Sequence, residues 1–418
     1  MISYKKALSI LENSKINIKD EKILSTESKN KISSKNVYSP CNYPSANNTA
    51  FDGFAINSKE TIGLNRKKQK KFKILKVLAA GDNPRISKIK KFSTIEVMTG
   101  ALINRPFDTV IPIEKVKYYP NNKNPKYIII REKIKKNNNI RKLGSDFKKG
   151  DKLISKGQII KSSHIMAFKT LGINQVLVKK NINISFYSTG NEISNNKKIK
   201  KWKVRNSNSH YLKSLLKNFP INFVEKKILR DNDLIKFNKE IKKKINSKTD
   251  LIITSGAVSA GKFDFIPKVI FNYKISKFFK GVAVRPGKPV MFAKFKNKNK
   301  VFFGLPGNPI SSAACFRFFV IPFIFLSTNV EVINPFSAKL KKNFVKKKKF
   351  TRFIKGRLKV SKKGLVEFDV LKGQESFRIN PFTKSNCWGI FPNGISNFKK
   401  GAIISCYTSL PWEELFLN

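Results

Sequence analysis

The sequence has few of the residues that proteins use for disulfide frameworks or transition-metal sites. Only four cysteines and two histidines occur among 418 residues. The cysteines lie far apart and form no Cys-x-x-Cys pair, so we expect reduced, buried thiols rather than a disulfide frame or a zinc site. Two histidines are too few for a histidine-based metal centre or catalytic triad. These residues are Cys41, Cys315, Cys387, Cys406, His164 and His210.

Acidic residues are also scarce. The chain has 26 aspartates and glutamates against 86 lysines and arginines, which gives a formal net charge of +60. The lysines are spread along the whole chain instead of forming one basic stripe with interleaved aromatics, so we interpret the charge as compositional drift. We expect no specific nucleic-acid partner, although salt-sensitive attraction to polyanions follows from such a charge.

Long apolar runs are missing as well. No stretch of about 18 apolar residues occurs, so no membrane span is expected. The longest candidate, residues 313–326, is interrupted by Arg317 and Pro322 and is predicted to be a helix buried against a sheet. The first residues lack the apolar core and cleavage site of a signal peptide. These absences predict a cytoplasmic protein with no membrane partner.

The most informative stretch runs from residue 250 to residue 312. Three apolar runs of strand length, at 251–254, 282–284 and 301–305, each stop at a cluster of Gly, Pro, Ser or Asn. This pattern predicts buried parallel strands whose following loops lie at one rim of a sheet. Open α/β sheets bind their ligands at that rim.

The residues of these loops are suited to anions. Thr254, Ser255 and Gly256 offer hydroxyls and a backbone that a ligand can approach, and a helix expected just beyond them would direct N–H groups at a phosphate. Arg285 and Lys288 flank a Pro-Gly turn, so two cations project from a stiff loop and could bind an oxyanion.

A carboxylate follows the first of these loops. Asp264 would repel an anion unless a metal ion lay between them, as Mg²⁺ does in many phosphate sites. In the alternative interpretation, glycine and proline only shape turns and the cations are solvated. Three such loops in succession favour the ligand site.

The remainder of the chain predicts several domains. An opening helix is expected up to about residue 20, and short β-rich runs between 56 and 131 indicate a small β domain. From about Ile182 strands and helices alternate, as in a parallel α/β sheet, and Asn206-Ser-Asn-Ser209 is expected to cap a helix. A second β module of short strands follows Pro335.

Eight motifs in order resemble one family, the molybdopterin molybdenumtransferases of the MoeA and gephyrin E-domain type. The resemblance covers almost the whole chain. Its motifs are Asn48-Thr-Ala-Phe-Asp-Gly-Phe-Ala55, Ala79-Ala-Gly81, Met98-Thr-Gly-Ala101, Asn139-Ile-Arg141 with Gly144 and Asp146, Ser188-Thr-Gly-Asn-Glu192, Ile253-Thr-Ser-Gly-Ala-Val-Ser-Ala-Gly261, Arg285-Pro-Gly-Lys-Pro289 and Gly304-Leu-Pro-Gly-Asn-Pro-Ile-Ser311.

The resemblance implies a reaction and its site. Molybdate would be inserted into adenylylated molybdopterin with release of AMP, assisted by Mg²⁺. The implied catalytic residues are Asp52, Thr99, Asp146, Glu192, Asp231 and Asp264, of which Asp52, Glu192 and Asp264 would bind the metal. The implied molybdate ligands are Arg285, Lys288, Pro289 and Ser311. The implied molybdopterin and phosphate ligands are Thr254, Ser255, Gly256, Ser259, Gly261, Pro306, Gly307 and Asn308.

The chain differs from the family pattern in its acidic residues. It has Asn47, Ser145, Asn191 and Lys262 where the family usually has carboxylates, and Ala257 replaces a glycine. An alternative therefore remains open, in which a protein of the same fold binds molybdopterin as a scaffold without turnover.

The resemblance also implies an architecture and partners. We expect a multidomain α/β protein with an elongated, discontinuous N-terminal α+β region at 1–50 and 137–178. A small β domain would occupy 51–136, the molybdopterin-binding parallel-sheet domain 179–328, and a β-barrel-like domain 329–418. A homodimer is implied, with Asp52 acting on the α/β domain of the partner, and a molybdopterin-adenylylating protein would donate the substrate.

Overall fold

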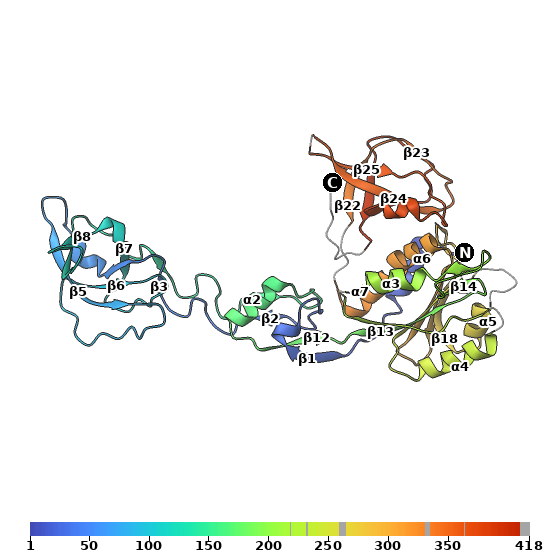
Figure 1. Ribbon diagram of the computed structural model, residues 1–418, viewed down its shortest axis with the longest axis horizontal. Helices are drawn as coiled ribbons and strands as arrows, with labels where there is room; N and C mark the ends of the chain where they lie inside the picture. The colour runs from blue at the N-terminus through green and yellow to red at the C-terminus, as the bar shows by residue number, and fades with distance from the viewer. Residues whose placement is uncertain (218, 231–232, 259–264, 331–334, 363, 410–418) are drawn as a thin grey trace. The chain divides into compact units, whose positions relative to one another are not determined.

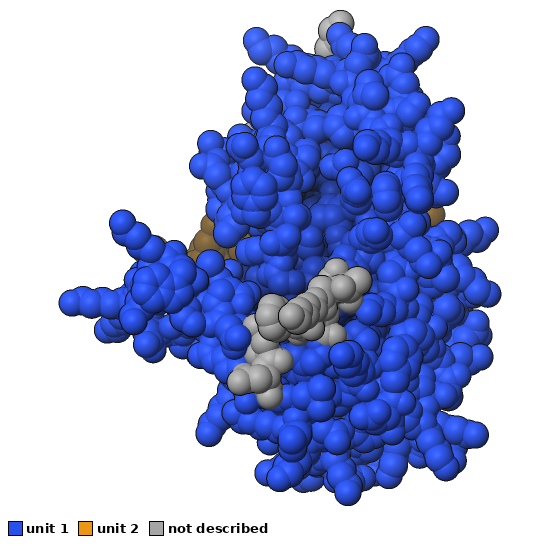
Figure 2. All heavy atoms as spheres, turned by 90° about the vertical axis from the view of Figure 1, so that its right-hand side faces the viewer, with its two compact units in different colours: residues 1–35, 156–162, 175–418 blue, residues 36–155, 163–174 orange. Residues whose placement is uncertain are grey.

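A computed structural model describes residues 1–217, 219–230, 233–258, 265–330, 335–362 and 364–409. The chain divides into two compact units. Unit 1 contains residues 1–35, 156–162 and 175–418 and is blue in Figure 2, and unit 2 contains residues 36–155 and 163–174.

Unit 2 is built around a six-stranded sheet with the strand order β7-β4-β6-β5-β9-β8. Apolar side chains pack on both of its faces, which explains why β4 is buried at every position. The β-rich runs expected between 56 and 131 form β5, β6, β7 and β9 of this sheet, and β8 is an additional strand. The strands are β4 (Gly53–Ile56), β5 (Lys70–Leu78), β6 (Ser93–Val97), β7 (Thr109–Pro112), β8 (Lys117–Tyr119) and β9 (Tyr127–Ile130).

Short elements complete the N-terminal half of the chain. In unit 2, β2 (Val37–Tyr38) pairs with β11 (Lys152–Ile154), and β3 (Asn48–Thr49) pairs with β10 (Ile140–Arg141). Helix α2 spans Ser162–Thr170. In unit 1, β1 (Asp20–Leu24) pairs with β12 (Gln175–Lys179), and the expected opening helix is α1 (Tyr4–Glu12).

Unit 1 contains a second six-stranded sheet, with the order β16-β13-β17-β21-β20-β18. The first four strands are parallel, as the apolar runs predicted, while β20 and β18 are antiparallel additions that were not predicted. Its strands are β13 (Ile182–Ser188), β16 (Ile221–Glu225), β17 (Leu251–Ser255), β18 (Ile275–Lys280), β20 (Met291–Phe295) and β21 (Val301–Leu305).

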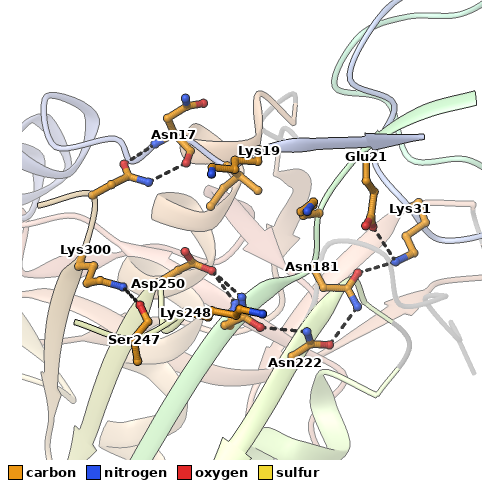
Figure 3. A pocket seen from close by; sticks show the side chains of 14 residues that line it. Asn17, Lys19, Glu21, Lys31, Asn181, Asn222, Ser247, Lys248, Asp250 and Lys300 are labelled. Atoms are coloured by element: carbon orange, nitrogen blue, oxygen red, sulfur yellow. Dashed lines mark hydrogen bonds and ion pairs between the residues drawn. The ribbon is translucent and has the colours of Figure 1, made fainter. Parts of the chain in front are cut away.

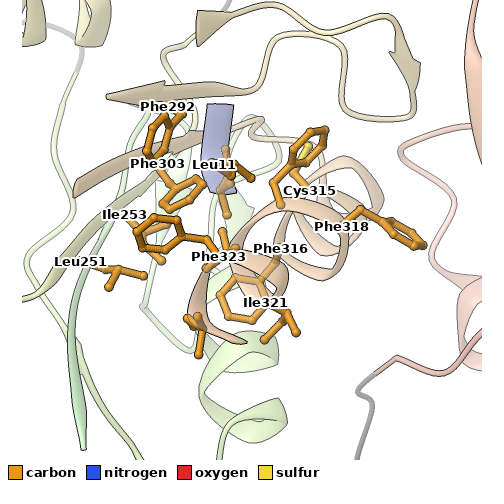
Figure 4. Close-up of a cluster of buried hydrophobic side chains, with 14 of the residues drawn as sticks. Leu11, Leu251, Ile253, Phe292, Phe303, Cys315, Phe316, Phe318, Ile321 and Phe323 are labelled. Atoms are coloured by element: carbon orange, nitrogen blue, oxygen red, sulfur yellow. The ribbon is translucent and has the colours of Figure 1, made fainter. Parts of the chain in front are cut away.

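Helices cover both faces of this sheet (Figure 1). Because strand side chains alternate between faces, Ile253 and Phe303 pack on one side and Ile252 and Phe302 on the other. The first side carries α1, α3 (Asn208–Leu215), α6 (Pro309–Cys315) and α7 (Ile321–Thr328), and Figure 4 shows its apolar core. The second side carries α4 (Leu234–Ile245) and α5 (Ile266–Phe271).

Helices α6 and α7 are joined by a π-helical turn, Phe316–Val320, into one apolar helix. Residues 309–328 are long and apolar enough to cross a membrane, but 89% of the apolar 18-residue window within them is buried inside the protein. Arg317, its one charged residue, is buried and donates its Nε–H to the Thr408 carbonyl at 2.7 Å. The helix is therefore accounted for as the core helix predicted for this stretch.

The C-terminal part of unit 1 is a closed barrel of five strands, as expected from the resemblance. Strand β24 pairs with both β25 and β26, which closes the ring β24-β25-β22-β28-β26 around an apolar interior. The strands are β22 (Phe336–Leu340), β24 (Thr351–Val360), β25 (Val366–Val370), β26 (Cys387–Phe391) and β28 (Ile403–Tyr407).

Two expectations from the sequence were wrong. The run 282–284 is no strand of the parallel sheet, because β19 (Val284–Arg285) pairs instead with β24 of the barrel. A two-residue strand between turns is too short to cross the sheet. Cys41 is exposed in a bend, although the other three cysteines are buried and all four are free thiols.

Candidate functional site

The predicted loops meet at one edge of the α/β sheet. Ser188, Ser255 and Leu305 are in register at the ends of β13, β17 and β21, so the segments that follow them begin side by side. Strand β20 runs the opposite way, and its first residue, Met291, pairs with Gly304. The Arg285–Lys288 turn, which precedes β20, therefore belongs to the same edge.

Gly256 allows two of these loops to touch. Its φ of +105° is in the region that favours glycine, and a Cβ atom there would lie 2.5 Å from both the carbonyl oxygen and Oγ1 of Thr189. A Cβ atom on Gly307 would lie 3.5 Å from the Cα atom of Gly256. Ala257 and Val258, directly after Gly256, are not helical, and residues 259–264 lie outside the described residues, so the expected helix is not tested there; the next described helix begins at Ile266.

Asn208 connects the loops after β17 and β21. Its side-chain amide donates to Ser255 Oγ at 2.7 Å and to the Gly307 carbonyl at 2.8 Å. The sequence interpretation assigned residues 206–209 to helix capping, but Ser207 at the N-cap position makes no capping bond with its side chain. Asn208 is thus a site residue that was missed, because a helix-start pattern and a loop-bridging amide use the same residue types.

The two hydroxyls predicted to hold the phosphate lie on opposite faces of β17. Ser255 accepts from Asn208 and donates to the Pro306 carbonyl at 3.3 Å. Thr254 is fully buried, and its hydroxyl has no hydrogen-bond partner among the residues that the structure describes. Because adjacent strand residues alternate, only Ser255 of the two lies on the side of Asn208 and Pro306.

The Arg285–Lys288 turn packs against helix α6. A Cβ atom on Gly287 would lie 2.5 Å from Cys315 Sγ and 3.8 Å from the Ser311 carbonyl oxygen. Burial raises the pKa of the Cys315 thiol, which stays protonated and donates to the Gly287 carbonyl at 3.5 Å. Arg285 and Lys288 are exposed, while Ser311 is buried in the first turn of the helix. The turn thus brings the predicted molybdate residues onto adjoining segments, with Pro289 directly following.

The Glu192 loop is held by an arginine that the sequence interpretation did not single out. Arg230 Nη1 donates to the carbonyls of Gly190, Asn191 and Ile193 at 2.9–3.2 Å. The Glu192 carboxylate folds back over Gly190, where a Cβ atom would lie 2.4 Å from Oε2. Glu192 is exposed, and no described residue forms a hydrogen bond or an ion pair with its carboxylate.

Asp52 and Thr99 are in direct contact in unit 2. The backbone N–H and the hydroxyl of Thr99 both donate to Asp52 Oδ1, at 2.6 and 2.7 Å. These bonds, that of the hydroxyl first, hold the pKa of Asp52 below its usual value. Asp146 is exposed in the same unit, and its backbone N–H donates to the Tyr43 carbonyl at 3.0 Å.

The implied magnesium ligands are only partly described. Asp264 and Asp231 lie outside the described residues, as do the predicted phosphate ligands Ser259 and Gly261. Among the described part of the chain, no three His, Cys, Asp or Glu side chains cluster into a metal site. Asp52 and Glu192 belong to different units, but both present the exposed carboxylate oxygens that Mg²⁺ prefers.

A separate cavity of about 750 Å³ opens at the opposite edge of the sheet. Figure 3 shows its asparagine- and lysine-rich wall, in which Asp250 accepts from the backbone and side-chain N–H groups of Asn183. Burial raises the pKa of this carboxyl group. None of the predicted site residues lines the cavity, so it is not part of the candidate site.

Three family models match successive parts of the chain. Residues 2–172 match the MoeA N-terminal region (domain I and II), residues 185–325 a probable molybdopterin binding domain, and residues 337–408 the MoeA C-terminal region (domain IV). The chain is also similar in fold to a molybdopterin biosynthesis MoeA protein from Pyrococcus horikoshii. That structure has 22% sequence identity and a TM-score of 0.80, covering 97% of this chain and 99% of the other.

Curated relatives match over nearly their full lengths. A molybdopterin molybdenumtransferase from Haemophilus influenzae is 30% identical over 91% of both chains. Another from Staphylococcus epidermidis is 29% identical over 96% of this chain and 94% of its own. The motif order, the fold and these similarities together show that the chain belongs to the molybdopterin molybdenumtransferase family.

Proposed function

We propose that this protein inserts molybdate into adenylylated molybdopterin and releases AMP, with Mg²⁺ bound during the reaction. Family membership supports the transferase class. The observation that carries the proposal is that residues from widely separated motifs lie on adjoining loops at one edge of the α/β sheet. Ser255, Gly256 and Gly307 form a joined pair of loops, and the Arg285–Lys288 turn belongs to the same edge.

The joined loops are suited to the pterin phosphate. Asn208 fixes the Ser255 hydroxyl and the Gly307 carbonyl in place, so the loops are ordered before a ligand arrives. Glycine at 256 allows its loop to pack against Thr189, and Gly307 of the loop after β21 lies close to Gly256, so the two loops come together. Pro306 and Asn308 complete this proposed phosphate site, together with Ser259 and Gly261.

The adjoining cations are suited to molybdate, a tetrahedral dianion. Arg285 and Lys288 are exposed, and Ser311 lies on the helix that supports their turn. Charge-assisted hydrogen bonds from such groups offset the repulsion that a dianion meets beside a phosphorylated substrate. These residues would bind and orient molybdate toward the dithiolene of molybdopterin.

The carboxylates would hold the metal. Asp52, Glu192 and Asp264 are the proposed ligands, and Mg²⁺ bound there would neutralise charge on the adenylyl phosphate during its cleavage. Thr99 keeps Asp52 ionised and oriented, and Arg230 fixes the loop that carries Glu192. Asp146 and Asp231 are proposed as further polar groups around the phosphate.

The assembly of the site is also a proposal. Asp52 lies in unit 2, while Glu192 and the cationic turn lie in unit 1. We propose that the working form is a homodimer in which Asp52 completes the site of the partner subunit. A molybdopterin-adenylylating protein would supply the substrate in the cytoplasm.

The test uses the purified full chain with adenylylated molybdopterin, in the presence and absence of molybdate and Mg²⁺. We expect AMP release only when both are supplied. If the pterin stays bound and no AMP appears at saturating molybdate and Mg²⁺, the protein is a molybdopterin-binding scaffold and not a transferase.

A further inference from the structure

The barrel contributes a second arginine beside Arg285. Strand β19 pairs with β24 in parallel, with Val284 opposite Thr351 and Arg285 opposite Arg352. Residues that are opposite each other in a sheet place their side chains on the same face. Two guanidinium groups therefore lie next to each other, where the turn before β20 meets the barrel.

Neither guanidinium is neutralised by a residue that the structure describes. No hydrogen bond or ion pair to the side chain of Arg285 or Arg352 forms among the residues described. The Nε atom of Arg352 is buried and has no hydrogen-bond partner there. Buried donors are nearly always paired, so an orphaned guanidinium nitrogen beside a second cation points to a ligand.

The neighbouring groups increase the local positive charge. Lys346 is buried, and its Nζ atom donates to the Phe350 carbonyl at 3.0 Å. Burial and the charge of Arg285 lower the pKa of Arg352, and burial and the charge of Arg352 lower that of Lys346. Like charges next to one another destabilise a fold, unless an anion binds between them.

Arg285 is also oriented before a ligand binds. Its guanidinium lies over the Phe350 ring, with Cζ 4.5 Å from the ring centroid. Stacking occupies the face of the guanidinium plane and leaves the N–H groups at its edge available for hydrogen bonds. The ring thus acts as a support that restricts the side chain of Arg285.

We propose that Arg352 and Arg285 together bind a tetrahedral oxyanion at this end of the barrel. The inference rests on the proposed function in one respect, since Arg285 is also a proposed molybdate ligand, and it adds a residue of the barrel to that site. Two planar donors on adjacent strands are suited to the several oxygens of molybdate or of a phosphate group. Arg352 is a binding residue that no sequence motif marks.

The test compares Arg352→Gln with Arg357→Gln. Arg357 is an exposed arginine of the same strand, roughly 16 Å farther along it, and its loss changes the net charge equally. Binding of molybdate and of inorganic phosphate is measured by calorimetry at moderate salt, which screens the general attraction of a basic surface. We expect Arg352→Gln to weaken binding about tenfold or more and Arg357→Gln to leave it nearly unchanged.

Thermal unfolding gives a second readout that separates binding from structural support. In buffer without oxyanions, Arg352→Gln should unfold at the same temperature as the wild type or higher, because it removes an unpaired charge. Addition of the oxyanion should raise the Tm of Arg352→Gln by less than it raises the Tm of the wild type. Suppose instead that Arg352→Gln has a lower Tm than the wild type without oxyanion, and that the oxyanion raises both Tm values equally. Arg352 would then only support the fold, and the inference would be overturned.

Arg285→Gln keeps the inference testable if the barrel does not tolerate a change at 352. It alters an exposed side chain and should cause a similar loss of affinity. If molybdate affinity falls on loss of either arginine, the ligand is molybdate. If only phosphate affinity falls, the ligand is a phosphate group of the substrate.

The inference is overturned if Arg352→Gln binds both oxyanions as tightly as Arg357→Gln does. Such a result would leave the proposed AMP release intact, whereas oxyanion binding without AMP release would refute the transferase alone.

Discussion

Thr99 donates two hydrogen bonds to one carboxylate oxygen of Asp52, at 2.6 Å from its backbone N–H and at 2.7 Å from its hydroxyl. Both bonds favour the ionised carboxylate, so the pKa of Asp52 is below its usual value. The ionised carboxylate of Asp52 therefore stabilises the folded state, and this contribution is complete at pH values above the pKa that Asp52 has in the unfolded chain. This contribution is lost as the pH falls through the pKa of the folded state.

Thr99→Val removes the hydroxyl and keeps the backbone N–H. We expect the pKa of Asp52 to rise toward its usual value, which the carboxyl carbon-13 shift of Asp52 would report during a pH titration. Thr170→Val, at another exposed threonine of unit 2, serves as the control. An unchanged titration of Asp52 in Thr99→Val would show that the hydroxyl has no influence on the carboxylate.

Gly256→Ala tests the contact between the loops. The new methyl group would meet the Thr189 carbonyl oxygen at 2.5 Å in a backbone conformation that alanine rarely adopts. We expect a loss of roughly 1–3 kcal/mol in the free energy of unfolding, measured by urea denaturation. Gly172→Ala is the control, because its φ is also positive but no atom lies within 4 Å of the added methyl. Equal losses in the two variants would mean that backbone strain, and not the close approach of Thr189, requires glycine at 256.

Asn208→Ala removes both bonds that join Ser255 to Gly307. Two net hydrogen bonds contribute about 1–3 kcal/mol, so the affinity for adenylylated molybdopterin should fall by about 5- to 150-fold. Asn222→Ala is the matched control, since this asparagine lies at the opposite edge of the same sheet. Pterin binding is followed by fluorescence, and equal affinities in the two variants would count against Asn208 as a loop-bridging residue.

Much of the fold was predictable because burial leaves a direct record in the sequence. The apolar runs at 251–254 and 301–305 are β17 and β21, buried at every position. Five residues buried on both faces must all be apolar or small, so such strands are easily recognised. The run 282–284 has a similar composition, but it is packed by turns and by β24, and composition does not distinguish these environments.

The candidate site was predictable to the extent that its residues lie in motifs. The motif turns were expected at one edge, and the structure brings Ser255, Gly307 and the Arg285–Lys288 turn there. Asn208, Arg230 and Arg352 were not recognised as site residues. Their roles arise from contacts with loops distant in sequence, and a single sequence contains no local signal for such contacts.

Mixed subunits test the proposed exchange of Asp52 between partners. Asp52→Asn and Glu192→Gln chains should each be inactive, whereas their co-expressed mixture should recover about a quarter of the wild-type rate. In half of the dimers, one of the two sites would then combine intact residues from both subunits. No recovery in a mixture shown by mass to contain mixed dimers would place both carboxylates of a site in one chain.

The most direct test of the central claim follows AMP and pterin-bound molybdenum in the same reaction. The wild type and Lys277→Gln, which alters an exposed lysine of β18, should release one AMP for each molybdenum transferred. Lys288→Gln should bind the pterin normally but release much less AMP. Molybdenum transfer without AMP release, or equal AMP release by Lys288→Gln and Lys277→Gln, would contradict the account.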